Sequence, residues 1–408
     1  MPGLRTLKPV KKVALAYSGG LDSTVCAKLL EREYAAREII LIMVDVGQGE
    51  ESLAEARGRV THLPWQLFEV DARQEFTDVW IPKAVAANGS YGGYPLSSSM
   101  TRQLIASRVA GIALEQGCDA VAEGSTGKGN DQFRFHNTFT LLAPELRVVT
   151  PIRDLNLSRV DERRLAREFD LTYKEGISDD KTCWGRSIGS GEIDDLEKQV
   201  EDGEYQWWRP VPADPPGPDR VTVEFRAGRP VRAGGVQGME AMITLLNEVA
   251  GRQSIGRIDV LEDGIMGLKS REVYEAPAAS VLLAAHRDLE RLCLTKRELA
   301  FKAHVEATWA DLVYHGHWFH PLKAQLDAFV AESQRSVSGA ITLDLHCGTA
   351  AVAARRSDQS LFDPTVRSVE LDSFDQSRMS AVVETYAFES AFLGGRNRRQ
   401  AVIQAPEI

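Results

Sequence analysis

The chain has 408 residues, of which 43% are hydrophobic and 26% charged, and its formal net charge is −10. This length allows a sizeable core and favours two domains. The acidic balance argues against a broad nucleic-acid surface, and no stretch approaches the roughly 20 apolar residues that span a bilayer. We therefore expect neither nucleic acid nor a membrane as a partner.

The five cysteines are scattered, without a CxxC pair or a metal-ligand spacing. The N-terminus runs directly into an apolar run and has no signal-peptide pattern. Both features predict reduced thiols in a cytoplasmic protein.

Apolar runs of strand length alternate with helical patterns in the first half of the chain. The runs at 13–17 and 39–46 are predicted strands, and a helix is expected over 23–34 between them. A further helix over 98–115 is followed by a short strand at 120–122. This alternation predicts an α/β fold, with a doubly wound parallel sheet in a nucleotide-binding domain.

The second half of the chain is less regular. A proline-rich stretch at 209–220 is predicted to be a linker or a long loop. It is followed by a strand pattern at 221–225, an amphipathic helix from Met239 that stops at Gly251, and another strand pattern at 341–346. The order predicts a second, α+β domain packed against the first.

The most specific motif is SGGLDS, residues 18–23, between the first strand and the first helix. Two adjacent glycines let backbone N–H groups approach an anion, and the helix adds its positive N-terminal end, so the loop suits a pyrophosphate. Asp22 would be repelled by bare phosphate and is expected to serve a Mg²⁺ ion or a loop amide. The alternative is a tight turn with Ser23 as helix N-cap, but the strand–turn–helix context favours phosphate binding.

A second glycine-rich segment, GSTGKGNDQFR, occupies residues 124–134. Its glycines expose backbone donors, and a cation, a carboxylate, amides and an arginine follow within eleven positions. Such a loop can hold a zwitterionic amino acid, whose two charged groups need opposite partners. A solvated glycine-rich loop is the alternative interpretation.

Both motifs carry a family resemblance. SGGLDS resembles the PP-loop of the N-type ATP pyrophosphatases. AYSGGLDST at 16–24 and GSTGKGNDQFRF at 124–135 are similar to the AYSGGLDTS and GATGKGNDQVRF segments of the argininosuccinate synthase family. Further matches continue in order from residue 12 to about 335: VDVGQ at 44–48, YPLSSSMTR at 94–102, WGRSI at 184–188, LNEVAG at 246–251 and GRIDVLEDGIMGLKSREVYE at 256–275.

The resemblance implies an ATP-dependent ligase that condenses citrulline with aspartate through a citrullyl-adenylate, releasing AMP and pyrophosphate. It implies a nucleotide-binding domain over 1–175 and a synthetase domain over 176–372. The short segment 373–408 would then supply an oligomerisation helix for a homotetramer. Mg²⁺ is expected to accompany ATP.

The resemblance also implies roles for individual residues. The expected catalytic residues are Asp22 and Lys128. The expected ATP-binding residues are Ala16, Tyr17, Ser18, Gly19, Gly20, Leu21, Asp22, Ser23, Thr24, Val44 and Gly124. The expected citrulline-binding residues are Tyr94, Ser99, Asn130, Arg134, Ser178, Ser187, Glu262 and Tyr274. The expected aspartate-binding residues are Thr126, Asn130 and Asp131. No transition-metal site is expected, since the histidines of HGHWFH at 315–320 have no cysteine or carboxylate partner at suitable spacing.

Two departures from the family pattern keep alternatives open. The segment SDDKTCWGRS at 178–187 differs from the family's YSIDxNLWGRS, and the chain from 373 onward is divergent. One alternative is a tRNA-modifying PP-loop enzyme, which would call for a basic surface and often for paired catalytic cysteines. The other is a nucleotide or amino-acid sensor that has kept the fold and lost turnover.

Overall fold

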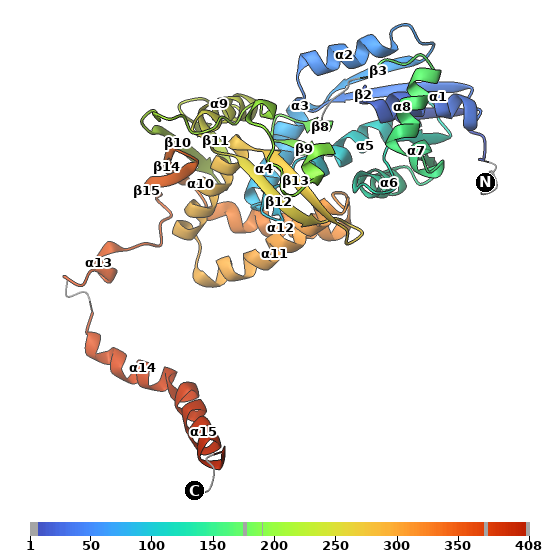
Figure 1. The fold of residues 1–408 in the computed structure, drawn as a ribbon. Coiled ribbons are helices and arrows are strands. Elements are labelled where there is room, and N and C mark those ends of the chain that lie inside the picture. Colours follow the sequence, from blue (N-terminus) through green and yellow to red (C-terminus); the bar gives the residue numbers. More distant parts are fainter. Residues whose placement is uncertain (1–6, 174–177, 190, 371–373, 405–408) are drawn as a thin grey trace. The chain divides into compact units, whose positions relative to one another are not determined.

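The structure is a computed structural model that describes residues 7–173, 178–189, 191–370 and 374–404 (Figure 1). The chain divides into two compact units, Met1–Gln359 and Ser360–Ile408. The first unit contains both the predicted nucleotide-binding part and most of the predicted synthetase part. The boundaries predicted at residues 175 and 372 stay predictions.

A five-stranded parallel sheet forms the centre of the N-terminal half, in the order β3-β2-β1-β6-β7. The strands are β1 (Lys12–Ala16), β2 (Glu38–Asp45), β3 (Gln66–Asp71), β6 (Ala120–Ala122) and β7 (Arg147–Val149). All neighbouring pairs are parallel. The strand order reverses beside β1, so the carboxyl ends of β1 and β6 border the crevice in which such folds bind ligands.

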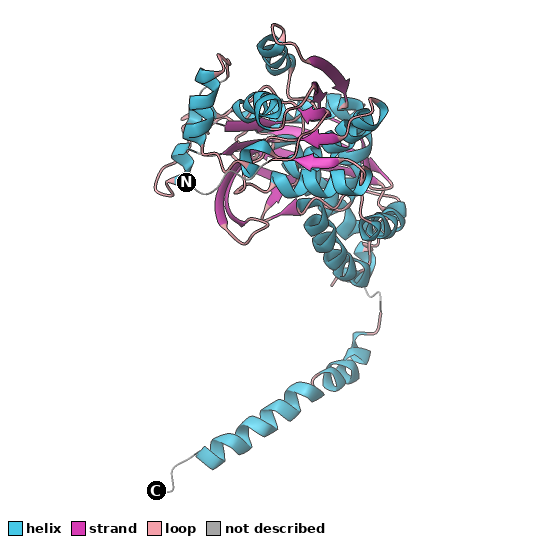
Figure 2. Ribbon diagram, turned by 90° about the vertical axis from the view of Figure 1, so that its right-hand side faces the viewer, coloured by secondary structure: helices cyan, strands magenta, loops and turns pink. Residues whose placement is uncertain are grey.

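Alternate residues of β1 enter different parts of the core, because side chains on a strand point to opposite faces. Val13 and Leu15 pack with residues of α1 (Leu21–Glu33), α2 (Glu50–Val60), α7 (Pro151–Asp154) and α8 (Arg159–Glu168). Ala14 and Ala16 share a second cluster with η1 (Phe76–Trp80), α4 (Ile81–Ala86), α5 (Ser98–Glu115) and α6 (Asp131–Leu142). Helices therefore cover both faces, which confirms the predicted doubly wound α/β domain (Figure 2).

Two antiparallel four-stranded sheets follow in the second half. One has the order β11-β10-β14-β15, with β10 (Asp219–Arg226), β11 (Arg229–Ala233), β14 (Gly339–His346) and β15 (Thr349–Arg356). The other has the order β12-β13-β9-β8, with β8 (Ser178–Lys181), β9 (Arg186–Gly189), β12 (Arg257–Asp263) and β13 (Lys269–Glu275). A small hairpin, β4 (Ser90–Tyr91) with β5 (Tyr94–Pro95), precedes α5.

Four long helices complete the first unit: α9 (Met239–Arg252), α10 (Pro277–Cys293), α11 (Lys296–Tyr314) and α12 (Pro321–Ser333). Their apolar faces join the cluster that already holds Ala14 and Ala16, so one continuous core links the parallel sheet to the second half. Shorter turns of helix are α3 (Arg73–Glu75), η2 (Gly191–Asp194), η3 (Asp202–Glu204) and η4 (Gln334–Ser336).

The second unit is helical. It contains α13 (Pro364–Arg367), η5 (Gln376–Arg378), α14 (Met379–Tyr386) and α15 (Phe388–Gln404). Large apolar side chains on the last two helices are exposed within this unit, among them Val383, Tyr386, Phe388 and Phe392. A folded helical segment therefore exists where the sequence is divergent.

Candidate active site

The loop SGGLDS joins β1 to α1 as predicted, in a shape that requires its first glycine. Gly19 has φ +75°, and a Cβ placed there would lie 2.4 Å from the Cβ of Ala56. The guanidinium of Arg59 donates to the Gly19 carbonyl at 2.8 Å. The turn is thus held by α2 and admits no side chain.

Hydroxyl groups fix the rest of the loop. Ser23 Oγ accepts from the backbone N–H of Ser18 at 3.3 Å and donates to the Gly20 carbonyl at 3.2 Å. Thr24 Oγ1 donates to the same carbonyl at 2.8 Å. Helix α1 begins at Leu21 with Gly20 as its N-cap, so the alternative role of Ser23 as N-cap is wrong. The serine lies inside the first turn, where it bonds back to the preceding carbonyl.

The carboxylate of Asp22 points to the start of α8. It pairs with the guanidinium of Arg159, which also lies 3.2 Å from the carboxylate of Glu162. Neither Arg159 nor Glu162 belongs to a motif that the sequence singled out, and their distance of more than 130 residues from Asp22 hides them from local patterns.

The second glycine-rich loop follows β6 and meets the first loop. A Cβ at Gly124 would lie 3.2 Å from the backbone nitrogen of Ser23. Buried Glu123 anchors the loop by accepting from the Ser125 N–H at 2.7 Å and from Thr150 Oγ1 at 2.8 Å. The two loops therefore touch at the carboxyl ends of β1 and β6, while Lys128 stands exposed further along the second loop.

Glu262 is the centre of a buried polar cluster that contains much of the predicted citrulline set. Tyr94 donates to one of its carboxylate oxygens at 2.6 Å. Tyr314, at 2.7 Å, and the side-chain amide of Asn130, at 3.2 Å, donate to the other. Tyr274 stacks on Tyr94 with ring centroids 4.1 Å apart. Burial, above all, raises the pKa of Tyr94, so its hydroxyl keeps the proton it donates.

Four charged groups adjoin this cluster. Arg102 pairs with Asp131 at 2.7 Å and with Asp180 at 3.0 Å, and Arg134 pairs with Asp131 at 2.8 Å. Burial alone would raise the pKa of the Asp131 carboxyl, but the two guanidiniums hold it below its usual range. Arg134 also donates from Nε to the Tyr314 carbonyl at 3.0 Å.

The remaining predicted residues differ in what the structure shows of them. The Ser99 hydroxyl is buried and, among the described residues, has no hydrogen-bond partner. Ser187 lies opposite Tyr274 in the pairing of β9 with β13. Thr126 is half-buried in the second loop. Ser178 lies in β8, but its side chain falls outside what the structure describes.

Besides Arg159 and Glu162, three residues of the site have no role predicted from the sequence: Arg102, Tyr314 and Glu272. Arg102 is the last residue of the family match YPLSSSMTR, but the match assigned it no role. Tyr314 directly precedes the HGHWFH segment and belongs to no motif that predicts a ligand site. Glu272 lies on β13 two residues before Tyr274 and therefore on the same face of the sheet. Burial and then the charge of Glu262 raise the pKa of Glu272 to about 7.

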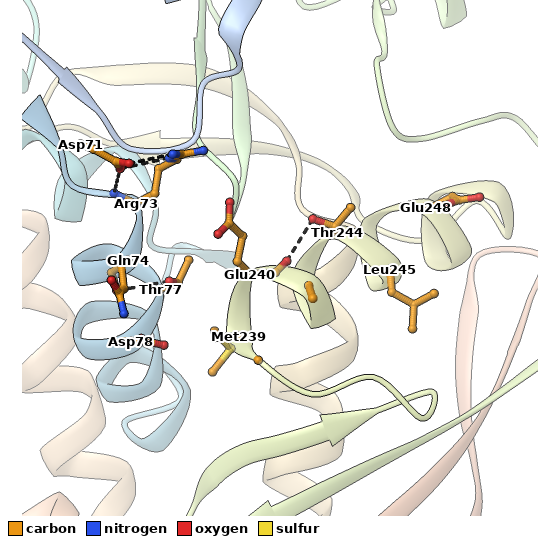
Figure 3. Close-up of a pocket in the computed structure, with 12 residues that line it drawn as sticks. Asp71, Arg73, Gln74, Thr77, Asp78, Met239, Glu240, Thr244, Leu245 and Glu248 are labelled. Carbon is orange, nitrogen blue, oxygen red and sulfur yellow. Dashed lines mark hydrogen bonds and ion pairs between the residues drawn. The ribbon is translucent and has the colours of Figure 1, made fainter. Parts of the chain in front are cut away.

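Two hollows in the described part of the chain lie away from these clusters. One, of about 890 Å³, lies between the segment that follows β3 and the start of α9, and Asp71, Arg73, Glu240 and Thr244 line it (Figure 3). The other, of about 640 Å³, begins at the end of β2 near Gly47. Neither hollow is lined by a residue of the two loops or of the Glu262 cluster.

Metal sites and membrane spans were sought in the described part of the chain. No group of three or more His, Cys, Asp or Glu side chains there is arranged to hold a metal ion. His320 of the HGHWFH segment instead caps α12, where its ring accepts from the Leu322 N–H. No described helix is both long and apolar enough to cross a bilayer.

A strand, an SGGLDS turn and a helix at the crevice of a doubly wound sheet define a PP-loop nucleotide-binding protein. Family models divide the chain between them: the arginosuccinate synthase N-terminal HUP domain matches residues 12–172, and the arginosuccinate synthase C-terminal domain matches residues 177–393. The chain therefore belongs to the argininosuccinate synthase family, the ATP-dependent ligases of arginine biosynthesis.

Similar curated proteins carry the same name. Argininosuccinate synthase of Methanopyrus kandleri is 42% identical over 385 residues, which cover 93% of this chain and 98% of that one. That of Methanocaldococcus jannaschii is 41% identical over 392 residues, covering 95% and 98%. A solved structure, the U34-tRNA thiolase NcsA from Methanococcus maripaludis, covers 42% of this chain and 62% of its own, at 19% identity and a TM-score of 0.31. A likeness that low carries no argument about function.

Proposed function

We propose that the phosphate loop and the Glu262 cluster form one active site, at which citrulline is adenylated by ATP and then joined to aspartate. The loop over residues 124–130 is the observation that supports a single site. Its first residue, Gly124, lies against the phosphate loop, and its last, Asn130, donates to Glu262. Reactants held at the two ends of one short loop would be close enough to react.

ATP would place its pyrophosphate on the loop from Ala16 to Thr24, with the nucleoside toward Val44 and Gly124. Hydrogen bonds of Arg59, Ser23 and Thr24 within the protein hold the shape of this loop. Such preorganisation means that backbone donors need not be rearranged as charge builds on the departing pyrophosphate. The ammonium of Lys128, exposed on the second glycine-rich loop, would add a positive charge for the pyrophosphate.

Mg²⁺ fits the donors that the loop offers. Mg²⁺ prefers oxygen ligands and is usually held by one or two carboxylates together with substrate phosphates. Asp22 supplies a carboxylate at the loop, and the same loop carries the hydroxyls of Ser18 and Ser23, which lie 3.2 Å from each other. Bound there, the ion would neutralise charge on the pyrophosphate.

Citrulline would lie against Tyr94, Ser99, Asn130, Arg134, Ser178, Ser187, Glu262 and Tyr274. Its ammonium suits Glu262, and its carboxylate suits the guanidinium of Arg134. The buried hydroxyl of Ser99 has a free hydrogen-bonding capacity that a polar ligand can satisfy. Aspartate would lie against Thr126, Asn130 and Asp131.

The reaction then proceeds by two displacements. The ureido oxygen of citrulline attacks the α-phosphorus of ATP, and pyrophosphate leaves toward the phosphate loop. The amine of aspartate attacks the activated ureido carbon, and AMP leaves. No protein nucleophile is required, so the contribution of the enzyme is positioning and electrostatic stabilisation.

The test is pyrophosphate release from the purified protein with Mg·ATP, omitting citrulline and aspartate in turn. We expect release to require citrulline, and argininosuccinate to form only when aspartate is also present. Glu262→Gln should lower citrulline-dependent release, whereas Arg164→Gln, on the exposed side of α8, should not. Release triggered by tRNA would refute the substrate assignment, and binding of ATP without any release would favour the sensor alternative.

We also infer a homotetramer assembled through the segment 373–408. The exposed apolar side chains of α14 and α15 support this assignment, because such surfaces are usually covered by a partner. Sedimentation of the full chain should show a tetramer, and of a chain ending at residue 372 a smaller species. A cytoplasmic location is supported by the five free cysteines.

A further inference from the structure

The residue Arg159 lies at the first position of α8 and reaches the phosphate loop. Helix α8 packs on α1, the helix that follows the loop. A capping box of Ser158 and Asp161 fixes the start of α8, where Arg159 projects. One guanidinium nitrogen contacts one oxygen of Asp22, and another lies 3.5 Å from the second oxygen. The cation is therefore held beside the loop by a well-ordered helix end.

Glu162, one turn further along α8, forms an ion pair with the same guanidinium. Its side chain is only 1% exposed, and one carboxylate oxygen lies 3.2 Å from Arg159. The other oxygen has no hydrogen-bond partner among the described residues. Burial and then the adjacent Asp22 raise the pKa of the Glu162 carboxyl. Two carboxyl groups so close cannot both ionise cheaply, and Arg159 is the cation that neutralises them.

The Arg159 guanidinium can exchange one anionic partner for another. While it pairs with Asp22 it is not available to a phosphate at the loop. The guanidinium is 43% exposed, so it can leave Asp22 without crossing packed side chains. Guanidinium groups bind both carboxylate and phosphate oxygens in a bidentate fashion.

We propose that Arg159 is a pyrophosphate-binding residue, which exchanges the Asp22 carboxylate for the β- and γ-phosphate oxygens of ATP while Glu162 holds its position. In the structure the guanidinium pairs with Asp22, and after the exchange the Asp22 carboxylate is available to a cation. This inference rests on the proposed binding of ATP at the loop. It does not depend on which substrate is adenylated.

The test is calorimetric titration of wild type, Arg159→Gln and the control Arg164→Gln with inorganic pyrophosphate and, separately, with AMP. We expect Arg159→Gln to weaken pyrophosphate binding about tenfold or more and to leave AMP binding within about twofold, because AMP has no β- or γ-phosphate. Arg159→Lys should fall between the two, since it keeps the charge and loses the fork. Unchanged pyrophosphate binding, or an equal loss for AMP, would overturn the assignment.

A second variant tests the exchange itself. In buffer without divalent cations, Asp22→Asn should bind pyrophosphate several-fold more tightly than wild type, because the guanidinium no longer has to leave a carboxylate. Adding Arg159→Gln to this variant should abolish the gain. A gain that persists in the double variant would contradict the exchange. Neither titration needs citrulline or aspartate, so a failed ligase assay would refute the proposed substrates and leave this result interpretable.

Discussion

Replacing Tyr314 by phenylalanine isolates one hydroxyl at the centre of the proposed citrulline site. The hydroxyl donates to Glu262 at 2.7 Å and accepts from the Asn130 amide at 2.9 Å. The phenylalanine ring can still stack on Tyr91, whose ring centroid lies 3.7 Å away. The substitution therefore removes hydrogen bonds while leaving most of the packing.

The expected cost follows from the charge of the acceptor. A hydrogen bond to an ionised group contributes about 1.5–3 kcal/mol. Asn130 still contacts the same oxygen at 3.2 Å, so we expect the lower end of that range. About 1.4 kcal/mol is a tenfold change in an equilibrium constant. If Glu262 binds the ammonium of citrulline in the ground and transition states alike, the KM for citrulline should rise about tenfold with kcat nearly unchanged.

The assay is steady-state pyrophosphate release at varied citrulline and, separately, at varied ATP. The KM for ATP should stay constant, and Arg164→Gln, at a side chain 60% exposed in α8, serves as the control. A citrulline KM within about twofold of wild type, together with a lowered melting temperature, would show that Tyr314 supports the fold and not the ligand. That result would refute the reasoning.

The structure predicts the outcomes of three further changes. Lys302→Met, which removes a cation 1% exposed and 2.9 Å from Glu290, should lower the free energy of unfolding by about 3–5 kcal/mol, measured with urea. The pKa of the Glu272 carboxyl is raised to about 7 in the folded protein, so the folded state binds more protons than the unfolded state. The free energy of unfolding of wild type, measured by denaturant titration, should therefore fall relative to that of Glu272→Gln between about pH 4.5 and 7. Parallel curves for the two proteins would contradict this. Gly19→Ala should reduce ATP affinity at least about tenfold, because it adds backbone strain to a steric clash, whereas Gly58→Ala, with open space around its Cβ, should not.

The phosphate loop could be predicted because its determinants are local. Adjacent glycines, a preceding strand and a following helix all lie within about twenty residues, and the structure confirms that arrangement. The helix start was misplaced by two residues, because Ser23 resembles an N-cap in sequence while its hydroxyl bonds back to Gly20. Local patterns cannot distinguish these two uses of a serine.

The Glu262 cluster could be predicted only in part. Its members come from separate segments around residues 94, 130, 262 and 314, and no periodicity relates them. The family resemblance supplied three of these residues; it included Arg102 without assigning it a role, and it did not include Tyr314. Both act through neighbours, by holding Glu262 and Asp131 respectively. The orienting role itself could not be predicted from a single sequence, since any segment that folds nearby can supply such a side chain.

The two carboxylates of the proposed site, Glu262 and Asp131, differ in the charges that surround them. Glu262 was expected to bind citrulline and Asp131 to bind aspartate, and both substrates carry an ammonium group. Asp131 already lies between Arg102 and Arg134, and with Asp180 these four charges sum to zero. The hydrogen bonds of Glu262 come instead from Tyr94, Tyr314 and Asn130, which are neutral donors. An incoming ammonium therefore gains a full opposite charge at Glu262, whereas at Asp131 it must compete with two guanidiniums already in contact.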